Sequence, residues 1–159
     1  MLGLVGVAQV AGALSGGGDL LQPLAGFTAG GTRGSAQAAE TPSFRRVRST
    51  AELDTVLNSA GGRPVMLDFY ADWCVACKEM EHLTFNQPPV QSRLAGALLL
   101  QADVTANSDE DKALLKRFGL FGPPGIVFFD GSGREKAGTR VVGFQAPQEF
   151  GASLTSAGL

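Results

Sequence analysis

The most constraining feature of the sequence is a pair of cysteines, Cys74 and Cys77, at a predicted strand-to-helix turn. The run 65–70 is apolar and rich in strand-forming residues, and the segment from Val75 onward suits a helix. Residues three apart on a helix share a face and lie roughly 5–6 Å apart, within the Cα separation that a disulfide accepts. The two thiols are therefore predicted to form and open a disulfide with little backbone movement.

The position of the pair predicts different roles for the two thiols. Cys74 is expected at the helix N-terminus, where unpaired N–H groups and the helix dipole favour a thiolate. The thiolate is the nucleophile in disulfide exchange, so Cys74 is the predicted attacking thiol. Cys77, one turn into the helix, is expected to be more buried and to act as the resolving thiol.

Two other interpretations of the cysteine pair stay open. A structural disulfide across a two-residue loop would restrict the unfolded chain only slightly. A metal site could use Cys74, Cys77 and His82, but these supply at most three soft ligands where structural zinc takes four. We favour redox exchange, because the C-x-x-C motif lies at a strand–turn–helix junction, between Trp73 and Lys78.

Two carboxylates are expected near the thiols. Asp68 lies in the middle of an apolar strand, where burial would raise its pKa, and we expect it to relay a proton to or from Cys77. Glu81 follows Cys77 by four residues and falls on the same predicted helical face. If both acids are close to the thiols, they oppose the helix dipole and raise the pKa of Cys74. The alternatives are an edge strand that turns Asp68 to solvent and an ordinary solvated position for Glu81.

The remainder of the chain alternates predicted helices and strands. Ser49 with Glu52, and Ser108 with Asp111, have the spacing of helix capping boxes. The order predicts an α/β protein with a mixed central β-sheet flanked by helices. The expected elements are strand 44–48, helix 49–60, strand 65–70, helix 75–85, a short helix from 88 to 94, strand 98–104, helix 108–118, strand 126–129, strand 140–144 and a helix from 147.

The first 43 residues differ from the rest in composition. They hold 10 of the 22 glycines, and the apolar run 2–14 is too short to cross a bilayer alone. We expect residues 1–43 to be the end of a transmembrane helix followed by a flexible glycine-rich linker, and residues 44–159 to be the globular domain. A signal peptide is the alternative, although no Lys or Arg precedes the apolar run. Both interpretations imply export of the globular domain.

A proline pair precedes the predicted strand 126–129. The segment 122–125 reads Gly-Pro-Pro-Gly, and we expect a cis peptide bond at Pro124 that packs against the cysteine pair. Pro124 would line a groove for a partner chain, together with Trp73 and Pro123. The alternative is a plain loop breaker.

Charge argues against nucleic acid as a partner. The net charge is −2, and the only dense basic group is Arg45, Arg46 and Arg48, which is typical of a solvated strand edge.

Several stretches of the sequence resemble a known family. The C-x-x-C at a strand-to-helix turn, the Asp six residues before it and the later Gly-x-Pro resemble the thioredoxin fold. More narrowly, the chain from about 44 to 154 is similar to the C-terminal domain of the DsbD family of thiol:disulfide interchange proteins. Val-Ala between the cysteines, instead of Gly-Pro, makes the resemblance specific. It rests on residues 70–81, 84–85, 99–107, 113–116 and 128–131.

The resemblance implies an electron relay on the periplasmic face of the bacterial inner membrane. Such domains take electrons from the membrane-embedded part of the same protein and pass them to its N-terminal domain, which reduces other periplasmic thioredoxin-fold proteins. By this resemblance, Cys74 is the thiol that attacks the partner disulfide and Cys77 is the resolving thiol. Asp68 and Glu81 match the acids that tune the reactivity of Cys74. No cofactor is implied beyond the Cys74–Cys77 disulfide. Pro124 matches the cis proline of the family. Pro123 before it and Gly125 after it depart from the family's pattern, in which a Thr is common here.

Two rival functions stay open. One is a stand-alone, membrane-anchored thioredoxin-like reductase for cytochrome c maturation. The other is a non-catalytic module that keeps the fold and binds a metal or a partner.

Overall fold

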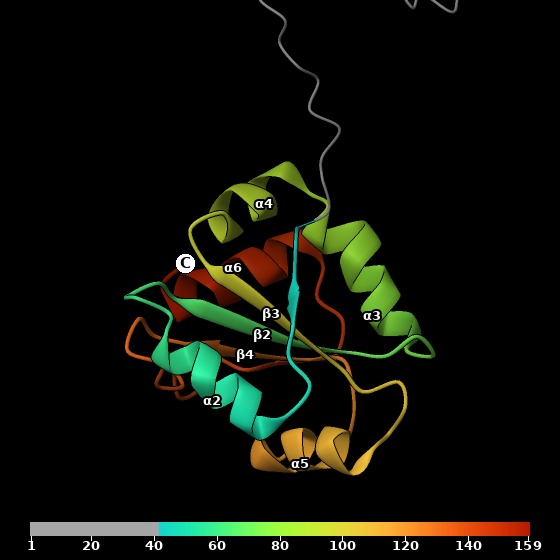
Figure 1. Cartoon of the computed structure of the whole chain (residues 1–159). Coiled ribbons are helices and arrows are strands. Elements are labelled where there is room, and N and C mark those ends of the chain that lie inside the picture. Colours follow the sequence, from blue (N-terminus) through green and yellow to red (C-terminus); the bar gives the residue numbers. More distant parts are fainter. Residues whose placement is uncertain (1–41) are drawn as a thin grey trace, which may run out of the picture. The chain divides into compact units, whose positions relative to one another are not determined.

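The computed structural model describes residues 42–159, and its centre is a five-stranded sheet in the order β1-β3-β2-β4-β5 (Figure 1). The central strand β2 (Val65–Tyr70) is parallel to β3 (Leu98–Asp103) and antiparallel to β4 (Gly125–Phe129). β1 (Arg45–Arg46) pairs with β3, and β5 (Val141–Val142) pairs with β4. The predicted mixed sheet is therefore confirmed, and the exposed arginines of β1 lie on an edge strand.

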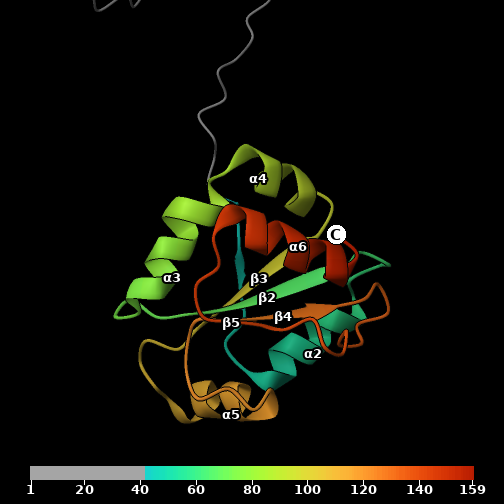
Figure 2. The same cartoon turned by 180° about the vertical axis from the view of Figure 1, so that it is seen from behind.

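Helices cover both faces of the sheet. α2 (Thr50–Asn58) and α5 (Asp109–Arg117) lie on one face, whereas α3 (Val75–Glu79), α4 (Pro88–Leu94) and α6 (Pro147–Ala157) lie on the other (Figures 1 and 2). The predicted order of helices and strands is confirmed, with most boundaries within a few residues.

The strand β2 is buried along its whole length, as expected for a central strand with helices on both faces. Side chains alternate between the two faces along a strand. Leu67 and Phe69 belong to the cluster that includes α2 and α5, whereas Met66 belongs to the cluster that includes α6. Asp68, two residues after Met66, therefore lies on the sheet face covered by α3 and α6.

The predicted helix 75–85 is not one regular α-helix. After α3 the chain continues as a π-helical segment, η2 (Met80–Phe85). A π-helical turn joins residue i to i+5, so Met80 and Phe85 both reach the core. The segment is also tied to the loop before α6, because Thr84 Oγ1 donates to the Gln145 carbonyl (2.6 Å) and the Gln145 N–H donates to Met80 Sδ (3.3 Å).

One of the two predicted capping boxes is complete. At α5, Ser108 accepts from the Asp111 N–H and the Asp111 carboxylate accepts from the Ser108 N–H. At α2, Ser49 caps as predicted, but the Glu52 carboxylate accepts from the N–H of Arg48, one residue further out. The α2 box is therefore only half formed.

The last strand is shorter than the predicted 140–144. After β4, Asp130 organises a turn by accepting from the backbone N–H groups of Ser132 and Arg134. Of the predicted residues 140–144, only Val141 and Val142 form the ladder with β4, and they are followed by a glycine, Gly143, at φ +87°. A backbone at that φ leaves the extended region, which ends the strand early.

Residues 1–41 lie outside the described part of the chain, so the predicted membrane helix, linker and domain boundary at 44 stay predictions. Within residues 42–159, no helix is both long enough and apolar enough to cross a membrane.

Candidate active site

The two cysteines form a disulfide at the start of α3. The S–S distance is 2.07 Å and the Cα atoms are 5.3 Å apart, within the predicted range. Cys74 is the N-cap residue of α3, and its sulfur accepts a hydrogen bond from the backbone N–H of Cys77 (3.2 Å). Cys77 Sγ lies 3.8 Å from the carbonyl oxygen of Phe69 on β2. The helix N-terminus therefore directs a backbone donor at the sulfur that is predicted to attack.

The local chain explains this placement. β2 ends at Tyr70, and a turn closed by the Cys74 N–H on the Ala71 carbonyl (3.0 Å) leads into the helix. Both cysteines are buried, with 6% of Cys74 and 3% of Cys77 exposed. Cys77 is the more buried of the two, as predicted, but by a small margin. Burial alone therefore does not separate the attacking from the resolving thiol.

Asp68 is buried in the central strand, with 4% of its surface exposed. The interpretation of an edge position facing solvent is therefore wrong. Gln101 on β3 is its register partner and donates from Nε2 to Asp68 Oδ2 (3.2 Å). Burial raises the pKa of Asp68 to about 7, although the hydrogen bond from Gln101 opposes the rise and the negative charge of Glu81 adds to it. The predicted rise is confirmed.

Glu81 is a half-buried residue of η2. Its charge contributes to the raised pKa of Asp68 and also of Tyr70, so it lies close to both groups. For Tyr70, burial and a hydrogen bond from its hydroxyl to Asp72 (3.0 Å) contribute more, and together they raise its pKa to about 12. The charge of Glu81 is therefore felt by two groups of β2.

The Pro123–Pro124 peptide bond is cis, as predicted. It directly precedes Gly125, the first residue of β4, which pairs with Phe69. Because Phe69 also contacts Cys77, the prolines lie at the same end of the sheet as the disulfide. Their role in a partner groove stays a prediction.

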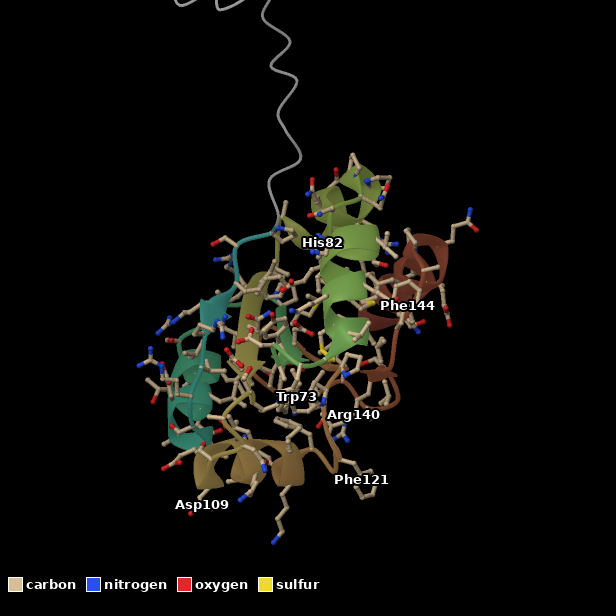
Figure 3. The ribbon with its side chains drawn as sticks, turned by 90° about the vertical axis from the view of Figure 1, so that its right-hand side faces the viewer. Trp73, His82, Asp109, Phe121, Arg140 and Phe144 are labelled. Carbon is tan, nitrogen blue, oxygen red and sulfur yellow. A yellow bond between two sulfur atoms is a disulfide. The ribbon has the colours of Figure 1, made fainter. Side chains whose placement is uncertain are left out.

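Exposed apolar side chains accompany the disulfide. Trp73 is 61% exposed, and Phe121 and Phe144 are also exposed. Figure 3 shows all three on the side of the molecule that carries the disulfide. Two of them, Phe121 and Phe144, were not predicted. Large aromatic residues in loops, outside the apolar pattern of a helix or strand, are the sequence signal that could have identified them.

Two further residues of the site were also not predicted from the sequence. Gln101 bonds Asp68, and Thr105 contacts the turn before Cys74 through Asp72 and Trp73. Both come from β3 or the loop after it, so only the pairing register of β2 and β3 brings them to the site.

The proposed metal ligands are not assembled. Both sulfurs are in the disulfide, and His82 lies on η2 away from it (Figure 3). Among residues 42–159, no group of three or more His, Cys, Asp or Glu side chains is arranged to hold a metal ion.

Comparison with known proteins identifies the family. A model of the thioredoxin-like domain matches residues 52–158. The reduced C-terminal domain of DsbD from Neisseria meningitidis superposes with a TM-score of 0.61 at 38% identity, over 71% of this chain and 99% of that domain. The chain belongs to the family of DsbD C-terminal domains. The DsbD of Ralstonia nicotianae is 52% identical over 99% of this chain, and that of Escherichia coli K12 is 48% identical over 84%.

The matched full-length relatives are named thiol:disulfide interchange proteins, and in this chain Cys74 and Cys77 form a disulfide. The chain spans about a quarter of the length of the full DsbD relatives, 26% in Ralstonia and 24% in Escherichia coli. The thioredoxin of Thermus thermophilus, at 24% identity and a TM-score of 0.58, shares the fold.

Proposed function

We propose that this domain relays electrons from a membrane-embedded part of a DsbD-like protein to its N-terminal domain, and through that domain to other thioredoxin-fold proteins outside the cytoplasm. The observation that carries the proposal is the disulfide at the N-terminus of α3, where the Cys77 N–H donates to Cys74 Sγ. This donor and the helix dipole stabilise a thiolate on Cys74 once the disulfide is reduced.

The chemistry is a balanced two-electron exchange. The Cys74 thiolate attacks one sulfur of the partner disulfide, and the other sulfur leaves as a thiolate. Cys77 then loses its proton and attacks Cys74 Sγ of the mixed disulfide. The Cys74–Cys77 disulfide forms, and the partner departs as a dithiol carrying both electrons. Reduction of the domain runs the same steps in reverse. A thiolate of the upstream dithiol attacks Cys74 Sγ, Cys77 leaves as a thiolate, and the upstream pair departs as a disulfide.

Asp68 is the proposed acceptor of the Cys77 proton. It lies on the same strand as Phe69, whose carbonyl contacts Cys77, and its pKa of about 7 allows it to take and return a proton at neutral pH. Burial keeps that pKa high, and the negative charge of Glu81 adds to it.

The partner is proposed to dock on the aromatic face formed by Trp73, Phe121 and Phe144, beside Pro123 and Pro124. Apolar side chains exposed next to a reactive pair favour another protein over a small polar substrate. Neither proline has a backbone N–H, and the Pro124 carbonyl already accepts from the Gly143 N–H (3.2 Å), so these two positions offer a partner strand no backbone donor.

The first test is the reduction potential of the Cys74–Cys77 pair, measured by equilibration with defined thiol buffers. A value of about −270 to −200 mV supports an electron donor, whereas a value near about −120 mV indicates a disulfide-forming oxidant and would overturn the proposed direction.

The second test traps the partner. Cys77→Ala leaves Cys74 able to attack but removes the resolving thiol, so a mixed disulfide with the N-terminal domain of a DsbD-like protein should accumulate. Cys74→Ala is the matched control and should give none. Equal trapping by both variants would contradict the assigned roles.

A further inference from the structure

The turn that carries Trp73 and Cys74 leaves the sheet beside the loop that follows β3. Tyr70 and Asp103, the last residues of β2 and β3, are register partners. The pairing continues one residue further, where the Val104 N–H donates to the Tyr70 carbonyl (2.8 Å). Residues 71–74 and 104–108 are therefore neighbouring loops at one edge of the sheet.

Thr105 bonds two consecutive residues of the active-site turn. Its hydroxyl accepts from the backbone N–H of Asp72 (2.9 Å), and its carbonyl accepts from the indole N–H of Trp73 (3.3 Å). Trp73 is 61% exposed, yet its indole is held by this bond. The turn is thus tied to the neighbouring loop just before Cys74.

Thr105 is itself held by Asp103. Its hydroxyl donates to Asp103 Oδ1 (2.5 Å), and its backbone N–H donates to the same oxygen (3.0 Å). The other carboxylate oxygen pairs with Arg46 of β1. A hydroxyl has one proton and two lone pairs, so Thr105 can donate to Asp103 and accept from Asp72 at once. Serine could do the same, but valine could not.

We propose that Thr105, anchored by Asp103, is a positioning residue that holds Trp73 in a fixed orientation for docking of a disulfide-bonded partner. An exposed tryptophan that is already ordered loses less conformational entropy when a partner covers it. The role concerns docking, because Thr105 bonds Asp72 and Trp73 and acts on the sulfurs only through the turn.

The test uses Thr105→Val in the full chain, with Thr105→Ser retaining the hydroxyl. If Thr105→Val does not fold, Thr105→Ala takes its place, since it removes the same hydroxyl with a smaller side chain. Thr55→Val is the control, since the Thr55 hydroxyl donates to the Ala51 carbonyl within its own helix. Trp73 is the single tryptophan of the sequence, so its fluorescence reports this site alone.

Thr105→Val should add a fast component to the fluorescence anisotropy decay of Trp73. Valine removes both hydrogen bonds of the Thr105 hydroxyl, and these bonds hold the residue whose carbonyl accepts from Trp73. Reduction of insulin by the reduced chain should therefore slow at least about fivefold, the factor that corresponds to one net hydrogen bond. Reaction with 2-hydroxyethyl disulfide, which is too small to need the docking face, should be unchanged. Thr105→Ser and Thr55→Val should match the wild type in all three measurements.

Unchanged anisotropy in Thr105→Val, or an equal loss of rate with both disulfides, would overturn the inference. The insulin measurement rests on the proposed reductase function, whereas the anisotropy does not. If the wild-type chain fails to reduce either disulfide, the proposed function fails, and the anisotropy still decides whether Thr105 orders Trp73.

Discussion

Asp68→Asn replaces a buried carboxylate with a neutral amide of nearly the same shape, and its effect on stability should depend on pH. Burial raises the pKa of Asp68 from 3.8 to about 7, against the opposing hydrogen bond from Gln101. Below pH 3.8 the carboxyl is protonated in both the folded and the unfolded chain, so it adds no penalty. Between the two values the folded chain binds more protons, so the wild type loses stability as pH rises.

The magnitude follows from the size of the rise. At about 1.36 kcal/mol per pKa unit, the ionised carboxylate destabilises the folded state by about 4 kcal/mol above pH 7. Between pH 5 and pH 8, the stability of Asp68→Asn relative to wild type should therefore increase by about 3 kcal/mol. This change isolates the carboxylate, because the packing of the amide does not depend on pH.

The assay is urea unfolding of the oxidised chain at pH 5 and pH 8. Both sulfurs are in the disulfide in this form, so no thiol titrates. Asp54→Asn is the matched control, since Asp54 is an exposed residue that pairs with Arg117 (2.6 Å), and such pairs contribute little. Its stability relative to wild type should be nearly the same at both pH values. A stability difference for Asp68→Asn that stays constant or shrinks from pH 5 to pH 8 would refute the reasoning.

Three further outcomes are expected. Gln101→Leu removes the amide that donates to Asp68, so the pKa of Asp68 should rise further. NMR titration of the Asp68 carboxyl carbon measures this pKa, and an unchanged value would contradict the expectation. Phe121→Ser should leave the free energy of unfolding within about 0.5 kcal/mol of the wild-type value, because Phe121 is exposed. It should slow reduction of insulin more than reduction of a small disulfide, and equal slowing of both would count against the docking face. Ser108→Ala should destabilise the chain by about 1 kcal/mol through loss of the α5 cap, and an unchanged urea midpoint would speak against that role.

Local patterns in the sequence were sufficient for most of the fold. Helix α5 was predicted from its capping box, and β2 from its apolar run, because both signals act between residues close in the chain. The π-helical segment η2 was not predicted. Its Met80 and Thr84 are bonded to Gln145, more than 60 residues away, and no local pattern shows that contact.

The site also contains features that local sequence patterns could predict. The spacing of Cys74 and Cys77 before a helix was enough to predict a disulfide and a reactive thiol, because a helix N-terminus places both within a single turn. The burial of Asp68 was predicted from its apolar neighbours, and the cis bond from the proline pair.

The sequence by itself was enough to predict the disulfide-forming pair and the thioredoxin-type fold around it, because the pair and its helix are adjacent residues that can be recognised without a distant partner. Only the tertiary structure decided what surrounds them. Gln101 reaches Asp68, and Thr105 reaches Trp73, because β2 and β3 pair in a particular register. A register shift of one residue would turn every side chain of a strand to the opposite face, so these contacts depend on the packing of the whole sheet.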